Sequence, residues 1–380
     1  MTGPIDPAPS PSPDTDATIE IFLCGDVMLG RGIDQVLPCP CTPEIHESHV
    51  GSALDYVSLA ERANGPIPAP VDYSYVWGAA LDEFERRRSH ARIINLETSI
   101  TRSDDAFPKG INYRMSPENA ACLTRAGIDC CTLANNHVLD WGRSGLLDTL
   151  ATLDRLGIKI AGAGPNATAA RGPAAIDCGA NRVMVFSFAS ATSGVPFGWA
   201  ANADVAGINL LADMSETSIA EAGEWIARSS RPGDVIVASI HWGPNWGYEI
   251  PDAQRRFAHG LIDRAGVSIV HGHSSHHAKA IEIHRDRLII YGCGDFINDY
   301  EGIRGYEEYR DDLAVMYFTQ IDRLSGNIAD LDMVPLQIRR FRLNRASDRD
   351  ADWLMRILDR ESQRFGVRIE RSARRTLTLA

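Results

Sequence analysis

Short runs of apolar residues alternate along the chain with longer segments in which apolar residues recur every three or four positions. Several of the short runs are apolar almost throughout, as is typical of strands in a sheet that is covered on both faces. The predicted strands cover 19–25, 91–96, 128–134, 158–162, 182–189, 234–240, 267–271 and 287–292, and the predicted helices cover about 75–90, 117–126, 143–156, 215–229 and 252–265. This alternation of strand and helix predicts a layered α/β domain.

The two ends of the chain differ from this alternating part. Residues 1–17 are rich in Pro, Ser and Asp, and we expect them to form a disordered tail. Residues 18–345 are expected to form one catalytic domain, in which the proline-rich segment 37–74 is an insertion or a lid. Two further strands are predicted at 312–322 and 328–338. Residues 346–380, with a predicted helix at 350–365, are expected to be a C-terminal helical cover.

Composition limits the classes of function. Acidic residues outnumber basic ones by 50 to 38, and the resulting charge of -12 argues against a nucleic-acid partner. No apolar run reaches the roughly 18 residues that a membrane-spanning helix needs, and the N-terminus does not resemble a signal peptide. The eight cysteines form no CxxC pair and most lie in apolar runs, which favours free thiols in a reducing compartment. We therefore expect a cytoplasmic protein without a membrane anchor.

Four of the eleven histidines fall inside the seven residues 271–277, directly after the apolar run 267–270. A strand that leads into a polar loop places side chains at the carboxyl edge of a sheet, where open α/β folds bind their ligands. Crowded imidazoles repel one another when protonated, so a neutral, metal-bound or carboxylate-paired state is favoured. The run predicts a metal or proton-transfer site, and it leaves open which of His271, His273 and His276 contacts a metal.

Other predicted strands also end in groups that are suited to a metal site. These ends carry Asp26, Asn95 with Glu97, Asn135 to His137 with Asp140, His241, and Asp295. Carboxylate and amide oxygens together with imidazoles form a mixed ligand set that suits Mn, Mg, Ca, Fe or Zn. Any one Asp or Asn beside a glycine could be an ordinary turn residue. Because such roles would have to hold at every strand end at once, the pattern predicts one shared site.

The same segments carry motifs that indicate a family. The motifs are GDVMLGR at 25–31, NLE at 95–97, ANNHVLDWG at 134–142, GAG at 162–164, HWG at 241–243, GHSSHH at 272–277 and YGCGDF at 291–296. From about residue 19 to 300 the chain resembles the CapA family of poly-γ-glutamate synthesis proteins, whose fold is similar to that of calcineurin-like metallophosphoesterases. The resemblance implies an α/β fold with central β-sheets flanked by helices. It also implies that the metal ligands or near-ligands are Asp26, Glu97, Asn136, His241 and His273.

The chain departs from the wider metallophosphoesterase pattern in ways that bear on the metal. That pattern begins with Asp-x-His, but the third position here is Met28, so one nitrogen ligand is missing. Where the second motif supplies a bridging Asp, this chain has Glu97. We therefore expect one firmly bound divalent ion, with Ca, Mn or Mg favoured over Zn or Fe. Asp295, where many CapA-like proteins carry Asn, adds an ionisable carboxylate near the histidines.

Two enzyme reactions are compatible with these residues. In a metallophosphoesterase, His137 would protonate the leaving oxygen of a phosphate ester. In a peptide epimerase, one group removes a Cα proton and another returns a proton to the opposite face, and the pairs His137 with Asp140 and His276 with Asp295 could supply these groups. The family's association with D-glutamate polymers, a resemblance to lasso-peptide epimerases and the loss of the nitrogen at Met28 favour the epimerase, acting on a peptide substrate. The alternatives are the phosphoesterase, a CapA-type poly-γ-glutamate biosynthesis protein, and a binding scaffold without activity.

Aromatic and basic residues near the predicted strand ends are the candidate substrate contacts. Aromatic side chains would accept an extended or aromatic substrate, and basic ones would accept a carboxylate or a phosphate. In the loop after residue 241 the tryptophans could instead be core residues. The predicted substrate-binding residues are Arg31, Lys109, Arg114, Trp242, Trp246 and Tyr248.

Overall fold

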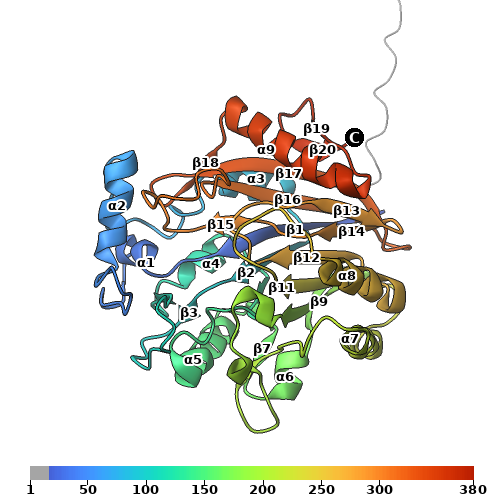
Figure 1. Ribbon diagram of the computed structural model, residues 1–380, viewed down its shortest axis with the longest axis horizontal. Coiled ribbons are helices and arrows are strands. Elements are labelled where there is room, and N and C mark those ends of the chain that lie inside the picture. Colours follow the sequence, from blue (N-terminus) through green and yellow to red (C-terminus); the bar gives the residue numbers. More distant parts are fainter. Residues whose placement is uncertain (1–16) are drawn as a thin grey trace, which may run out of the picture.

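The computed structural model describes residues 17–380, so the predicted disorder of the N-terminal tail concerns residues that lie almost wholly outside the described part. Two large β-sheets pack against each other in the centre, and helices cover their outer faces (Figure 1). The expected α/β fold with central sheets flanked by helices is confirmed. Among residues 17–380, no helix combines the length and the apolar character needed to cross a bilayer.

The larger sheet has ten strands and is mixed. Its parallel part consists of β1 (Thr18–Val27), β2 (Ala91–Leu96), β5 (Cys130–Thr132), β6 (Lys159–Ala161) and the short β15 (Asp295–Ile297). Its antiparallel part consists of β16 (Leu313–Asp322), β17 (Ile328–Ile338), β18 (Leu343–Arg345), β19 (Ile369–Arg371) and β20 (Leu377–Leu379). The strand order β19-β20-β17-β16-β1-β2-β5-β6 places β1 in the middle, where both its faces are covered.

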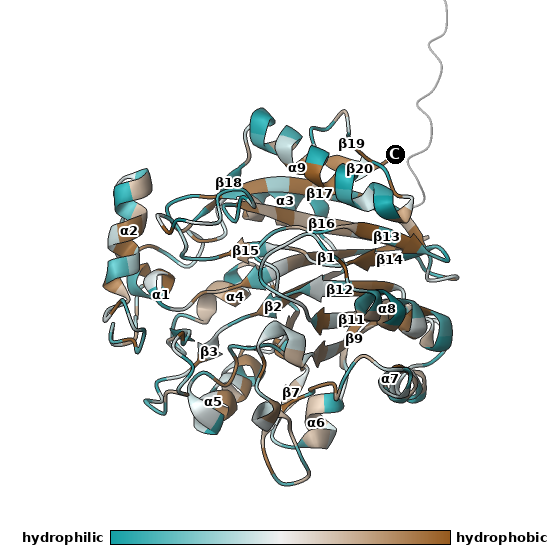
Figure 2. Cartoon of the chain, in the orientation of Figure 1, coloured by the Kyte–Doolittle hydropathy of each residue, from teal (hydrophilic) through white to brown (hydrophobic). Residues whose placement is uncertain are grey.

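The smaller sheet has six strands in the order β13-β14-β12-β11-β9-β8. The strands are β8 (Ala174–Cys178), β9 (Asn181–Ala189), β11 (Val235–His241), β12 (Ile269–His273), β13 (Ile281–His284) and β14 (Arg287–Ile290). The four inner strands are parallel and the two edge strands are antiparallel to their neighbours. In Figure 2 the strands of both sheets are mostly brown, because their apolar side chains point into the layers between sheets and helices.

Three apolar layers hold these elements together. The faces that the two sheets turn toward each other form the middle layer, with Leu23 and Ile93 from one sheet and Val237 and Ile269 from the other. On the outer face of the larger sheet lie α3 (Ala79–Arg87), α4 (Ala121–Arg125) and α5 (Gly142–Arg155), and on that of the smaller sheet lie α7 (Glu216–Ser229) and α8 (Asp252–Ala265). Burial at roughly 25 cal/mol per Å² of apolar surface makes this packing the main source of stability.

The remaining elements are short or peripheral. They are α1 (Gly32–Val36), α2 (Leu54–Asn64), α6 (Ala167–Arg171), the strand pairs β3 (Ser99–Ile100) with β4 (Arg114–Met115) and β7 (Ala163–Gly164) with β10 (Gly207–Ile208), and the 3-10 turns Ala191–Ser193, Phe197–Trp199 and Gln363–Phe365. The predicted insertion 37–74 contains α2, which lies at the side of the molecule in Figure 1. The predicted C-terminal cover contributes α9 (Asp348–Ser362), but the residues after it form β19 and β20 and extend the larger sheet instead of forming more helix.

The two sheets touch closely where their central strands end. The His271 ring nitrogen Nε2 lies 2.7 Å from the carbonyl oxygen of Cys24, and Ser239 Oγ lies 3.2 Å from Thr132 Oγ1. Gly25 permits this approach, since a Cβ at that position would lie 1.5 Å from the carbonyl oxygen of Gly294. The carboxyl ends of β1, β2, β11 and β12 are thereby brought to one place.

Candidate metal centre

Asp26, His241 and His273 lie together at this junction. Each offers one ligand atom, and the three atoms lie within 4.8 Å of one another. Asp26 ends the regular part of β1, whereas His241 and His273 are paired neighbours at the ends of β11 and β12. All three side chains have no exposed surface. The larger sheet therefore supplies an oxygen and the smaller sheet supplies two nitrogens.

The hydrogen bonds of the two histidines point both Nδ1 lone pairs at the same spot. His273 Nε2 lies 2.8 Å from Ser239 Oγ, whose own proton is directed to another acceptor, so Nε2–H of His273 donates to it. His241 Nε2 lies 3.0 Å from Asn136 Oδ1, and Nε2–H donates there. Both Nδ1 atoms are then bare, and they lie 2.8 Å apart. Two lone pairs at this distance repel each other, and a cation between the rings would turn this repulsion into ligation.

Asp26 is held in place from both sides of its carboxylate. Asn95 Nδ2 donates to Oδ1 at 2.7 Å, and the backbone N–H of Ser274 donates to Oδ2 at 3.1 Å. Ser274 has a φ of 100°, a strained conformation for a residue with a side chain, and this turn is what aims its N–H at the carboxylate. Oδ1 also lies 3.7 Å from His273 Nδ1. The carboxylate orientation is thus built into the backbone.

Glu97 and Asn136, the other predicted ligands, border this group. Glu97 Oε1 lies 3.6 Å from His241 Nε2 and 3.9 Å from His137 Nε2. Glu97 Oε2 is buried and has no hydrogen-bond partner among the described residues. Buried polar atoms are rarely left without a partner in native proteins. A buried carboxylate oxygen without a partner at the edge of this group is available as a further ligand of a cation.

The pKa shifts of the site residues also indicate a cation site. Burial, followed by repulsion from Asp295, raises the pKa of Asp26, and burial and Asp26 raise that of Glu97 well above its usual range. Burial lowers the pKa of both His241 and His273 well below the ordinary histidine value. Without a cation these groups are driven to their neutral forms, whereas a bound divalent ion would stabilise ionised carboxylates and neutral imidazoles together. The residues fit a metal ion.

A first His–Asp pair lies beside the centre. His137 Nδ1 lies 2.6 Å from Asp140 Oδ2, and Lys109 Nζ lies 2.7 Å from Asp140 Oδ1. Burial, with the positive charge of Lys109 second, lowers the pKa of His137 well below its usual value, and burial raises the pKa of Asp140 to about 7. His137 keeps 8 % of its surface exposed, and its Nε2 lies 3.9 Å from Glu97 Oε1. The group is suited to accept a proton.

A second His–Asp pair approaches through β15. His276 Nδ1 lies 2.9 Å from Asp295 Oδ1, and Asn298 Nδ2 donates to Asp295 Oδ2 at 2.8 Å. Burial alone would lower the pKa of His276, but the Asp295 carboxylate outweighs it and raises the pKa. Asp295 is the partner of Asp26 in the pairing of β15 with β1. Opposite shifts in two histidines of one site are typical of a base and an acid.

Two tyrosines lie between the pairs. The Tyr113 ring packs on His137 with 4.1 Å between centroids, the Tyr300 ring packs on His276 at 5.2 Å, and the two hydroxyls are 2.7 Å apart. The Arg31 guanidinium carbon lies 4.5 Å from the centre of the Tyr113 ring. Each of the two histidines therefore packs on one member of a hydrogen-bonded pair of tyrosines. The sequence reasoning missed both tyrosines, because neither belongs to a metal-ligand motif.

Three of the predicted substrate-binding residues are buried and form contacts within the fold. Arg31 is 3 % exposed and binds Asp299 through Nε and Nη2, so its charge is already neutralised. Arg114 is 7 % exposed, and its guanidinium packs on Trp141 and donates to the carbonyl of Ser103. Trp242 is 2 % exposed and belongs to the core beneath α7 and α8, since it follows the inward-facing His241 and successive residues face opposite ways. A substrate contact is not needed to explain the positions of these three residues, and it stays a prediction.

The other three predicted contacts lie near the centre. Lys109 binds Asp140 and the carbonyl of Asn136. Trp246 packs 5.1 Å from His276, and it stacks on Tyr306 at 4.1 Å. Tyr248 packs on His277 at 4.6 Å. A substrate contact for these residues stays a prediction.

The histidine run separates into different roles. His271 donates from Nε2 to the Cys24 carbonyl and is fully buried away from the ligand atoms. His273 is the one that joins Asp26 and His241, and His276 forms its pair with Asp295. Ser239, which orients His273, was also missed, although its place two residues before His241 puts it on the same face of the strand.

Comparisons with known proteins show the family of the chain. Residues 20–300 match the family described as bacterial capsule synthesis protein PGA_cap. The chain is 47% identical over 354 residues to a probable polyglutamine synthesis accessory protein of Mycobacterium tuberculosis, with 92% of this chain and 93% of the relative covered. It is 26% identical over 328 residues to the capsule biosynthesis protein CapA of Bacillus anthracis, with 84% and 68% covered.

A solved structure described as a novel phosphatase of Mycoplasma pneumoniae is a weaker match. Its TM-score is 0.47 at 10% identity, and the match covers 86% of this chain and 95% of that one. So distant a likeness carries no argument about the reaction. The family match spans most of the chain, including every strand that contributes to the metal centre, and the chain belongs to the PGA_cap family of bacterial capsule synthesis proteins.

Proposed function

We propose that this chain is a metal-dependent accessory enzyme in the synthesis of a glutamate polymer of the capsule type. Membership of the PGA_cap family and the names of its relatives support the process. The observation that carries the enzymatic part is the buried group of Asp26, His241 and His273 with a His–Asp pair on each side of the neighbouring tyrosines. A protein that only bound a polymer would gain nothing from burying so many titratable groups, which is costly.

Asp26, His241 and His273 would hold the metal, with Glu97 and Asn136 beside them. A divalent cation bound there would supply a Lewis acid that stabilises negative charge on a substrate oxygen. Of the ions favoured by the sequence, Mn²⁺ suits this set best, because Ca²⁺ and Mg²⁺ prefer all-oxygen sites and two of the donors are imidazoles. Nearby, the positive charge of Lys109 would favour an anionic substrate.

The chain's own residues would move the protons. Asp140 holds the Nδ1–H of His137, which leaves Nε2 as a lone pair that can take a proton from the substrate or from water. Asp295 holds Nδ1–H of His276 and favours the protonated ring, so Nε2–H of His276 can return a proton. The aromatic rings around both histidines limit the access of water.

A second candidate, epimerisation at Cα of a glutamyl residue or another peptide substrate, is favoured by the placement of the two pairs. Inversion requires a base on one face of the carbon and an acid on the other, and His137 and His276 pack on different members of the tyrosine pair. A hydrolase needs a base and an acid too, but it does not need them on opposite faces of one carbon. The cytoplasmic location expected from the sequence stays a prediction.

Two incubations separate the possible reactions. The purified chain with Mn²⁺ is incubated in D₂O, in one sample with poly-γ-glutamate and in another with p-nitrophenyl phosphate. New amine ends and shorter chains indicate amide cleavage, deuterium at Cα indicates epimerisation, and phosphate release indicates a phosphoesterase. Asp26→Asn should abolish the observed activity, whereas the exposed Arg228→Gln should retain it. If none of these products forms and the purified protein binds no divalent ion, the proposed function is wrong.

A further inference from the structure

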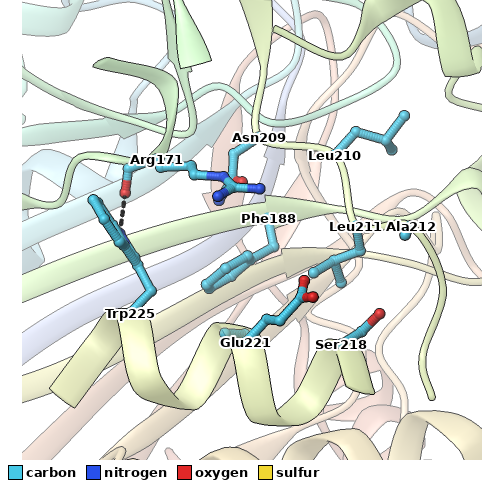
Figure 3. Close-up of a pocket in the computed structure, with 10 residues that line it drawn as sticks. Arg171, Phe188, Asn209, Leu210, Leu211, Ala212, Ser218, Glu221 and Trp225 are labelled. Atoms are coloured by element: carbon cyan, nitrogen blue, oxygen red, sulfur yellow. Dashed lines mark hydrogen bonds between the residues drawn. The ribbon is translucent and has the colours of Figure 1, made fainter. Parts of the chain in front are cut away.

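A pocket of about 120 Å³ lies between α6, α7 and the end of β9 (Figure 3). None of the metal-centre residues lines it. Phe188, Leu211 and Ala222 form its floor and are each less than 9 % exposed, as part of the core that α7 covers. Trp225 forms one wall. The pocket thus offers an apolar floor that a small nonpolar group can cover.

Two opposite charges face each other across this floor. Arg171 ends α6 and Glu221 lies on α7, and in Figure 3 their side chains enter the pocket from opposite sides. Neither side chain forms an ion pair within residues 17–380. Trp225 Nε1 donates to the backbone carbonyl of Arg171 at 2.8 Å, which ties the end of α6 to α7.

Asn209 adds a third polar group. Its Nδ2 donates to the carbonyl of Ser187 at 2.9 Å, which orients the carboxamide. Its Oδ1 has no hydrogen-bond partner in the described part of the chain. The pocket therefore presents the cation of Arg171 at its rim, and the carboxylate of Glu221 with an amide oxygen to receive a positively charged group; Arg171 and Glu221 are both exposed to solvent.

We propose that this pocket binds a free α-amino acid with a small apolar side chain. Arg171 would bind the carboxylate, Glu221 and Asn209 Oδ1 would bind the ammonium group, and the side chain would cover Phe188 and Leu211. An apolar cavity of about 150 Å³ accommodates benzene, so this pocket has room for roughly six to eight heavy atoms, as in alanine to valine. A peptide carries only one of the two charges at each end, so the site selects the free amino acid.

The first test compares three ligands by isothermal titration calorimetry with the full chain. L-Valine should bind. N-acetyl-L-valine lacks the ammonium charge and L-valinamide lacks the carboxylate charge, so each should bind at least about tenfold more weakly than L-valine. Equal binding of a blocked ligand, or no binding of L-valine at millimolar concentration, would overturn the proposal. Removal of divalent ions with EDTA should leave L-valine binding unchanged. Binding that disappears with EDTA would place the ligand at the metal centre and would also overturn it.

The second test changes the two charges. Arg171→Gln and Glu221→Gln should each weaken L-valine binding about tenfold or more. The matched control is Glu224→Gln on the same helix, because Glu224 is exposed and is paired with Arg228 outside the pocket. This control should bind L-valine as the unchanged chain does. Unaltered affinity in both pocket variants, when circular dichroism shows them folded, would contradict the assignment, and the three-ligand comparison decides the matter without any variant.

Discussion

Glu97→Gln tests the metal centre with the least disturbance of its surroundings. Gln has the shape of Glu but carries no charge. Glu97 Oε2 has no hydrogen-bond partner in the described chain and Oε1 has only contacts of 3.6 Å and longer to the histidines, so Asp26 is the polar neighbour that the change affects most. The substitution therefore keeps the shape of the side chain and removes its ability to ionise.

The expected sign differs between the two forms of the protein. Burial and Asp26 raise the pKa of Glu97 well above its usual range, so the folded metal-free protein binds this proton more tightly than the unfolded chain does. Taking up that proton costs at most about 3 kcal/mol, and Glu97→Gln should recover about 1–3 kcal/mol of unfolding free energy. The folded state carries this cost only above the pKa that Glu97 has in the unfolded chain, and the cost grows as pH rises. The stability gained by Glu97→Gln should therefore be smaller at pH 5 than at pH 7. In the metal-bound form the lost carboxylate should weaken Mn²⁺ binding about 10–100-fold.

Urea unfolding with EDTA measures the first effect, and titration calorimetry with Mn²⁺ measures the second. The control is Glu118→Gln, because Glu118 is exposed and pairs only with Arg102 at the surface. It should change the unfolding free energy by less than about 0.5 kcal/mol. A Glu97→Gln protein that is less stable than wild type without metal, or that binds Mn²⁺ with unchanged affinity, would refute the reasoning.

Three further changes test other parts of the structure. Asp295→Asn removes the charge that raises the pKa of His276, so the alkaline limb of the pH–rate profile should move to lower pH while metal content stays unchanged; an unmoved limb would exclude His276 as the acid. Arg31→Met leaves the buried Asp299 without its cation and should cost about 3–5 kcal/mol in urea unfolding, and a loss below about 1 kcal/mol would contradict the structural role. Trp242→Phe loses one buried hydrogen bond to a backbone carbonyl and should cost about 1–3 kcal/mol in thermal unfolding with kcat unchanged; a KM effect would restore its substrate role.

The apolar runs were sufficient to predict most of the central strands. β1, β2, β9, β11, β12, β14, β16 and β17 all lie within a few residues of the predicted ranges. Strands buried on both faces are continuous apolar segments, so their signal is local. β15 was not predicted, because a three-residue strand has almost no pattern of its own and exists only through its pairing with β1.

The site was predictable to the level of strand ends and not of individual atoms. His271 and His273 lie on the same face of β12, two residues apart, and the sequence cannot rank them. The two histidines differ in which part of β1 they face across the junction of the sheets. His271 contacts the carbonyl of Cys24, whereas His273 lies beside Asp26. The burial of Trp242 could have been predicted from the sequence. Successive strand residues face opposite ways, so the residue after His241 faces the core on the other side of the sheet.

The amino-acid order determined which segments are buried strands, which residues end them and which family the chain belongs to, because burial and motif spacing are properties of neighbours in the chain. Only the tertiary structure decided which charges meet. Arg31 is neutralised by Asp299, 268 positions later, and the two His–Asp pairs are separated by Tyr113 and Tyr300, which are 187 positions apart. Pairings over such separations depend on how two sheets pack, and local sequence carries no record of that packing.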